Sequence, residues 1–136
     1  MPPLRDYQQE ALARMQHYEG RAALLVLATG LGKTRIFTEF LRWEVNENDH
    51  HCLILSHREE LVHQPLTYLQ DLTCGVELAD KRANHEPIIS ASVQSLVSRL
   101  DKYNPREIDT IIVDDERVII RTKLEKPSKI KGLALI

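Results

Sequence analysis

This chain of 136 residues has little of what marks secreted, membrane-spanning or metal-stabilised proteins. Its two cysteines, Cys52 and Cys74, are too few for a disulfide framework and do not have metal-ligand spacing. Its apolar runs fall far short of the roughly 20 residues that cross a bilayer, and its first residues lack the apolar core of a signal peptide. The sequence therefore predicts a cytoplasmic protein that does not enter a membrane.

Net charge is also low, because 18 Lys and Arg stand against 20 Asp and Glu, giving a formal charge of −2. This balance excludes a polycation that binds nucleic acid by bulk charge alone. The charge is uneven, however, since residues 117–136 carry six basic residues, one acid and no aromatic residue. We expect an ordered domain over residues 1–116 and a flexible, divergent basic tail over residues 117–136.

What the chain does have is a regular alternation of apolar patterns, and 43% of its residues are hydrophobic. Apolar residues at helical spacing alternate with short unbroken apolar runs that are typical of strands buried on both faces. The expected helices cover 4–18, 36–43, 58–70 and 93–100, and the expected strands cover 22–27, 52–55, 88–89 and 111–113. Pro65 should kink or divide the third helix. The alternation predicts an α/β fold with a parallel sheet and helices on both faces.

A glycine-containing loop, residues 28–34 (ATGLGKT), lies between the first expected strand and its helix. Glycines allow a tight turn that aims several backbone N–H groups at one anion, and the following helix adds its positive dipole end. Lys33 can place its ammonium between the β- and γ-phosphates of ATP, and the Thr34 hydroxyl can ligate Mg²⁺. The alternative is an accidental glycine turn. The predicted nucleotide-binding residues here are Thr29, Gly30, Leu31, Gly32, Lys33, Thr34 and Arg35.

Three acids follow the last expected strand, at the sheet edge where the chemistry of parallel sheets collects. Asp114 is the predicted partner of the Mg²⁺ held by Thr34, directly or through water. Asp115 or Glu116 is predicted to polarise the attacking water, and Lys33 completes the catalytic set. The alternative is a solvated acidic turn.

Together these residues resemble the first RecA-like domain of superfamily 2 helicases and translocases, in the branch of repair helicases and restriction-enzyme motor subunits. Residues 4–11 (LRDYQQEA) are similar to the family's Q-type motif, in which Gln8 would read adenine. Residues 27–34 are similar to motif I and residues 109–114 to the approach to motif II. The resemblance covers about residues 4–116 and implies a partial RecA-like P-loop domain that uses ATP and Mg²⁺.

Two more segments resemble family motifs that meet the nucleic-acid backbone. Residues 53–64 (LILSHREELVHQ) look like motif Ia, and residues 90–96 (SASVQSL) are similar to a strand-to-helix motif. The alternative for each residue singly is a helix cap or a solvated surface position. The resemblance implies contacts to DNA rather than RNA from Ser56, His57, Arg58, Ser92 and Gln94.

The chain departs from the family after Asp114. The family has Asp-Glu-x-His, whereas this chain continues with Asp115, Glu116 and Arg117. Nothing beyond resembles the next family motif or the second RecA-like domain with its arginines, so we expect a partial motor domain that needs that second domain. Residues 117–136 have two interpretations. One is a shifted reading frame, because codons for residues 118–122 can read His-His-Pro-His when shifted. The other is a natural variant with a basic tail.

The predicted function is thus the N-terminal ATP-binding domain of an ATP-dependent DNA helicase or translocase, which alone binds ATP weakly and hydrolyses it barely. A second hypothesis is a non-catalytic nucleotide- or DNA-binding module that acts beside a partner. A third is a small-molecule kinase with the same phosphate loop. The two backbone-contact segments disfavour the third hypothesis, because a kinase does not need them.

Overall fold

The computed structural model describes residues 3–18, 22–26, 32–114 and 118–123. Helices in this part of the chain are α1 (Asp6–His17), α2 (Lys33–Asn48) and α3 (Val93–Val97). Strands are β1 (Ala22–Val26), β2 (Cys52–Ser56), β3 (Cys74–Glu77), β4 (Ile88–Ser92), β5 (Thr110–Asp114) and β6 (Val118–Lys123). Short 3₁₀ turns are η1 (Glu59–Leu61), η2 (Pro65–Tyr68), η3 (Leu100–Lys102) and η4 (Pro105–Glu107).

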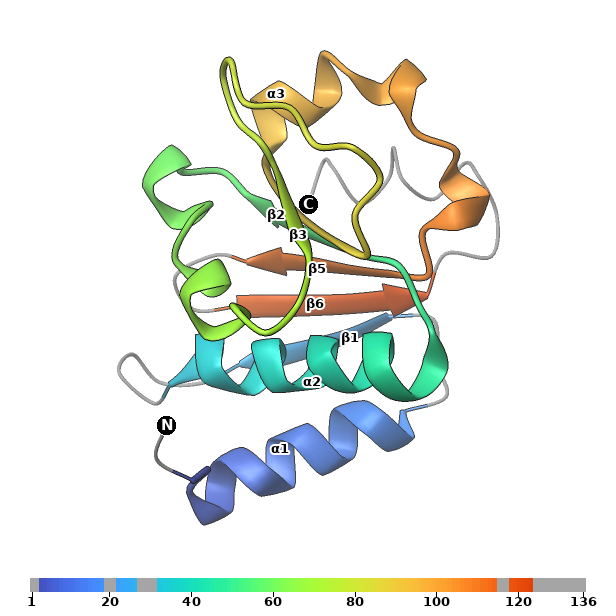
Figure 1. Ribbon diagram of the computed structural model, residues 1–136. Coiled ribbons are helices and arrows are strands. Elements are labelled where there is room, and N and C mark those ends of the chain that lie inside the picture. Colours follow the sequence, from blue (N-terminus) through green and yellow to red (C-terminus); the bar gives the residue numbers. More distant parts are fainter. Residues whose placement is uncertain (1–2, 19–21, 27–31, 115–117, 124–136) are drawn as a thin grey trace.

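The described strands form one sheet in the order β1-β6-β5-β2-β4-β3. β5, β2, β4 and β3 are parallel, with Ser56 of β2 in register with Asp114 of β5 and with Ser92 of β4. β6 is antiparallel to both of its neighbours, β5 and β1 (Figure 1). β1 and β5 therefore point the same way, and their carboxyl ends lie at one edge of the sheet together with those of β2, β3 and β4.

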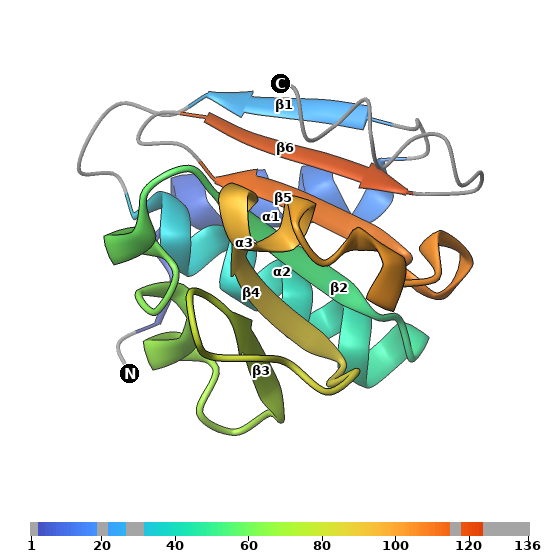
Figure 2. The same cartoon turned by 90° about the horizontal axis from the view of Figure 1, so that it is seen from above.

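Both faces of the sheet are covered. α1 and α2 lie on one face, while α3 and the 3₁₀ turns near it lie on the other (Figure 2). Strand β2 shows why, because its buried residues alternate between two hydrophobic clusters. Cys52 and Ile54 pack with Phe37 and Phe40 of α2, whereas Leu53 and Leu55 pack in the cluster that contains Leu96 of α3. The predicted α/β fold with helices on both faces is confirmed.

Two segments differ from the expected elements. The helix predicted over residues 58–70 is replaced by η1 and η2, because Pro65 is the first residue of η2 and has no N–H to continue a helix. Residues 118–123, which the sequence assigned to the basic tail, form β6 between β1 and β5. Its β-branched run favours a strand, and both of its edges are hydrogen-bonded to neighbours.

Candidate nucleotide and nucleic-acid site

The candidate phosphate site begins where α2 begins. Gly32 precedes the helix with φ 73°, a left-handed conformation that glycine adopts without strain. Lys33 and Thr34 are the first two residues of α2, and the ammonium nitrogen of Lys33 is buried. The helix N-terminus and a buried cation therefore lie together at the carboxyl edge of the sheet, where an anion would be favoured.

Gln8 of α1 lies against this helix start. Its side chain is buried, its Oε1 accepts the backbone N–H of Arg5 at 2.9 Å, and its Nε2 lies 3.5 Å from the carbonyl oxygen of Gly32. A Cβ on Gly32 would collide with Gln8 Nε2. The structure thus brings the predicted adenine-reading residue next to the predicted phosphate loop, although they are 24 positions apart in the sequence.

Arg35, also predicted to bind nucleotide, has a different partner. Its guanidinium forms an ion pair with Glu39 one turn along α2, and Glu39 also pairs with Arg42. Arg42 in turn donates to Asp71 at 2.9 Å, and this hydrogen bond raises the pKa of Arg42. These contacts tie α2 to the segment after η2, so Arg35 belongs to a structural charge network in this structure.

The acid strand ends at the same edge. Asp114 is the last residue of β5, in register with Ser56 on one side and Ile119 of β6 on the other. Since neighbouring strands are about 4.8 Å apart, β6 sets β1 and β5 about 10 Å apart. Asp114 and the start of α2 that carries Thr34 consequently lie at the same edge, but the strands that lead to them, β5 and β1, are not adjacent. Thr29, Gly30, Leu31, Asp115 and Glu116 lie outside the described residues.

The five predicted nucleic-acid residues fall into two groups. His57 and Arg58 are exposed just after β2, and Gln94 is exposed at the start of α3. Ser56 and Ser92 are fully buried. Ser92 caps α3, because its Oγ accepts the backbone N–H of Ser95 at 3.1 Å. Only the exposed group can meet a ligand in this structure, and Ser92 takes the capping role that was its alternative.

The sequence gave no warning of a charged cluster at the end of β3. Glu77 has no exposed surface and accepts hydrogen bonds from Arg99 at 2.9 Å, from Lys102 at 2.8 Å and from Tyr103. Burial alone would raise the pKa of Glu77, but these three donors and a backbone hydrogen bond from Ala83 together lower it. The sequence shows only that Glu77 follows a short, largely apolar segment. Such an acid can equally lie at the surface, so its burial is visible only in the fold.

The chain belongs to the family described as type III restriction enzyme, res subunit, whose profile matches residues 1–117. This is the N-terminal helicase region of superfamily 2, as the motifs predicted. The fold agrees with that of the type ISP restriction-modification enzyme LlaGI, solved as a nuclease-deletion mutant with a DNA substrate mimic. The TM-score is 0.62 at 18% identity, over 84% of this chain and 15% of that enzyme.

Two curated yeast proteins, both assigned as ATP-dependent helicases, are similar in sequence. IRC3 of Saccharomyces cerevisiae is 35% identical in an alignment of 129 residues, and the match covers 84% of this chain and 19% of that protein. The irc3 protein of Schizosaccharomyces pombe is 36% identical in an alignment of 123 residues, and the match covers 82% of this chain and 20% of that protein. The chain spans about a fifth of the length of these relatives.

The second relative is named as mitochondrial, so the cytoplasmic location stays a prediction. Within the described ranges, none of the helices has the length and apolar character needed to cross a membrane.

Proposed function

We propose that this chain is an ATP-binding motor domain of a DNA helicase or translocase. The observation that carries the proposal is the start of α2, where Gly32, the buried Lys33 ammonium and Gln8 meet at the carboxyl edge of the sheet. Such a helix start favours a triphosphate through its N–H groups and dipole. Both yeast relatives are assigned as ATP-dependent helicases, which supports ATP as the nucleotide.

In this proposal each residue has one task. Lys33 binds the β- and γ-phosphates, Thr34 ligates Mg²⁺, and Gln8 contacts the adenine. Asp114 would hold the metal, directly or through water. Asp115 or Glu116 orients the attacking water, and the arginines of a second RecA-like domain supply charge stabilisation worth on the order of a thousandfold.

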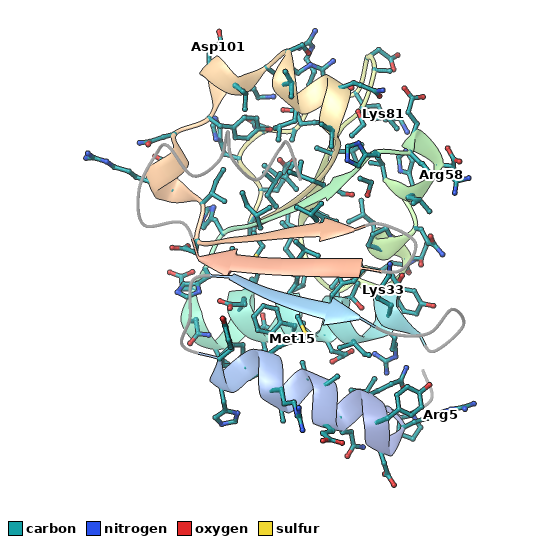
Figure 3. The ribbon with its side chains drawn as sticks, turned by 180° about the vertical axis from the view of Figure 1, so that it is seen from behind. Arg5, Met15, Lys33, Arg58, Lys81 and Asp101 are labelled. Carbon is teal, nitrogen blue, oxygen red and sulfur yellow. The ribbon has the colours of Figure 1, made fainter. Side chains whose placement is uncertain are left out.

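The nucleic-acid partner in the proposal is DNA. The LlaGI structure contains a DNA substrate mimic, which supports this choice over RNA. His57, Arg58 and Gln94 lie at the edge of the sheet that also carries Lys33, and Figure 3 shows Arg58 and Lys33 on the same side of the molecule. Contacts from these side chains would hold the DNA backbone without reading its sequence.

Calorimetry with Mg-ATP tests the nucleotide site. We expect measurable binding by the wild-type chain and at least a tenfold weaker affinity in Lys33→Ala, because the ammonium that neutralises the phosphates is gone. Arg14→Ala is the matched control, since Arg14 is exposed on α1 and pairs only locally with Glu10. A folded wild-type chain that gives no heat, or equal affinities for wild type and Lys33→Ala, would refute the proposal.

The second hypothesis, a binding module without turnover, has one observation in its favour. β6 stands between the strand before the phosphate loop and the acid strand. The two functions separate in a hydrolysis assay with single-stranded DNA. Hydrolysis that DNA stimulates and Lys33→Ala abolishes supports the motor, whereas binding of ATP and DNA without hydrolysis supports the module.

A further inference from the structure

The turn after β3 is held in an unusual conformation. Leu78 and Lys81 bridge each other through backbone hydrogen bonds of 3.1 and 2.8 Å, which closes a tight turn. Ala79 inside the turn has φ 53°, in the left-handed region that residues with a Cβ rarely adopt. A conformation of this kind persists only where its surroundings hold it, and it often accompanies a functional site.

Those surroundings come from the segment after β4. Ser95 Oγ accepts the backbone N–H of Ala79 at 3.0 Å. The Arg99 guanidinium donates to the carbonyl of Lys81 at 2.9 Å and to the carbonyl of Ala79, while its other hydrogen bond goes to the buried Glu77. The turn is therefore fixed by α3 and the residues that follow it, the same region that presents Gln94.

The fixed turn presents Lys81 to solvent beside the segment after β2. The Lys81 ammonium lies 3.4 Å from His63 Nε2, and both side chains are exposed. Arg58 pairs with Glu60 and Arg99 with Glu77, but among the described residues no carboxylate pairs with Lys81. Lys81 and Arg58 lie on the same side of the molecule (Figure 3). In this contact Lys81 donates and His63 Nε2 accepts, because an ammonium has no acceptor. With the imidazole in its other tautomer, Nε2–H and the ammonium can both donate to one phosphate oxygen.

We propose that Lys81 and His63 together bind a backbone phosphate of single-stranded DNA, on a turn that Arg99 and Ser95 hold in place. The proposal rests on the proposed DNA-binding function and extends it to residues of the β3 turn. Phosphate contacts of this kind position a strand and carry no sequence information. They also release counterions, so each one adds to the salt dependence of binding.

Fluorescence anisotropy with a labelled oligothymidylate, measured on the full chain over a series of salt concentrations, tests the proposal. In Lys81→Ala the slope of log affinity against log salt should be shallower than in wild type by about 0.7, the loss of one single-strand phosphate contact. The ratio of wild-type affinity to Lys81→Ala affinity should fall by roughly two- to threefold between about 50 and 200 mM salt. Lys81→Arg should keep the wild-type slope, because it keeps the charge.

Arg106→Ala is the matched control, because Arg106 is an exposed cation in η4, before β5 and thus at the opposite edge of the sheet. It should leave the slope unchanged. Wild-type binding with equal slopes in Lys81→Ala and wild type would overturn this inference alone. An equal loss in Arg106→Ala would overturn it too, since only bulk charge would matter. A folded wild-type chain without DNA binding would overturn both this inference and the DNA-binding function.

Discussion

Because Gly32 has no Cβ, the start of α2 and Gln8 of α1 can lie in contact in the candidate site. Its left-handed backbone starts α2, and its lack of a Cβ lets Gln8 reach its carbonyl oxygen. The motif pattern predicted glycine for the loop turn, but the contact with α1 became visible only in the fold. One residue therefore sets both the helix start and the position of the proposed adenine contact.

Replacing Gly32 by alanine should lower the free energy of unfolding by about 1–2 kcal/mol from the left-handed conformation alone. The collision with Gln8 Nε2 adds to this cost. Urea unfolding of Gly32→Ala, Gln8→Ala and the double variant separates the two contributions. The double variant should be less destabilised than the sum of the singles, because Gln8→Ala removes the collision but not the backbone strain. Strict additivity would contradict the contact.

Glu77 predicts a specific response to acid. Its folded-state pKa lies below the ordinary value of 4.5, so its ionised form stabilises the fold at pH values above 4.5. That contribution is lost as the pH falls through the lowered folded-state pKa. Glu77→Gln should cost roughly 2 kcal/mol or more at neutral pH, because Arg99 and Lys102 lose their counter-charge.

The deficit of Glu77→Gln should shrink as the pH falls from about 4.5 toward the lowered folded-state pKa, because the unfolded chain takes up a proton at Glu77 before the folded wild type does. Chemical denaturation of both proteins across a pH series measures the difference. The exposed Glu107→Gln variant serves as a control and should follow wild type throughout. A constant Glu77→Gln deficit at every pH would show that the charge of Glu77 is not responsible.

At the scale of elements, the sequence predicted those helices and strands that show an apolar periodicity or end at a helix-breaking residue. Unbroken apolar runs marked β1, β2 and β5 and the first two residues of β4, and helical stripes marked α1 and α2. Pro65 correctly signalled a break. β3 escaped prediction because Cys74–Glu77 is short and contains a glycine. The position of β6 escaped because strand order depends on long-range pairing, of which a single strand's sequence contains no trace.

β6 can be tested through its backbone alone. Ile120 is in register with Leu24 on one side and with Val113 on the other, so proline there removes a ladder hydrogen bond in a central strand. Ile120→Pro should destabilise the chain by about 1–3 kcal/mol in urea unfolding. Val118→Pro should cost less, because proline is tolerated at the first residue of a strand. Equal, negligible effects would place residues 118–123 outside the sheet.

At the scale of the whole molecule, the proposed reaction depends on arginines from a second RecA-like domain. The chain spans about a fifth of its yeast relatives, and the proposed arginines belong to a second domain. We therefore expect the isolated chain to hydrolyse Mg-ATP far below ~1 s⁻¹, the low end of ordinary enzyme turnover. A phosphate-release assay, with Lys33→Ala as the blank, measures this. Turnover in the ordinary range would mean that one domain suffices.

The candidate site was predictable at the level of motifs and less so at the level of contacts. Lys33, Thr34 and Asp114 fall at the predicted sheet edge because strand ends and helix starts follow from local patterns. The burial of Ser56 and Ser92, the ion pair of Arg35 and the Arg99 contacts follow from packing between distant segments. Sequence patterns state which residue types are available, whereas tertiary contacts decide which of them remain free for a ligand.

The place of β1 in the sheet has a consequence for local opening. Among the described strands β1 pairs with β6 alone, so its amide protons are protected only while β6 stays in place. In native-state hydrogen exchange, β1 should then exchange no more slowly than β6, and both should exchange faster than the doubly paired centre at β2. Whenever β6, nearly a hundred residues later in the chain, unpairs from β5, the strand that leads into the phosphate loop would thus lose its connection to the centre of the sheet.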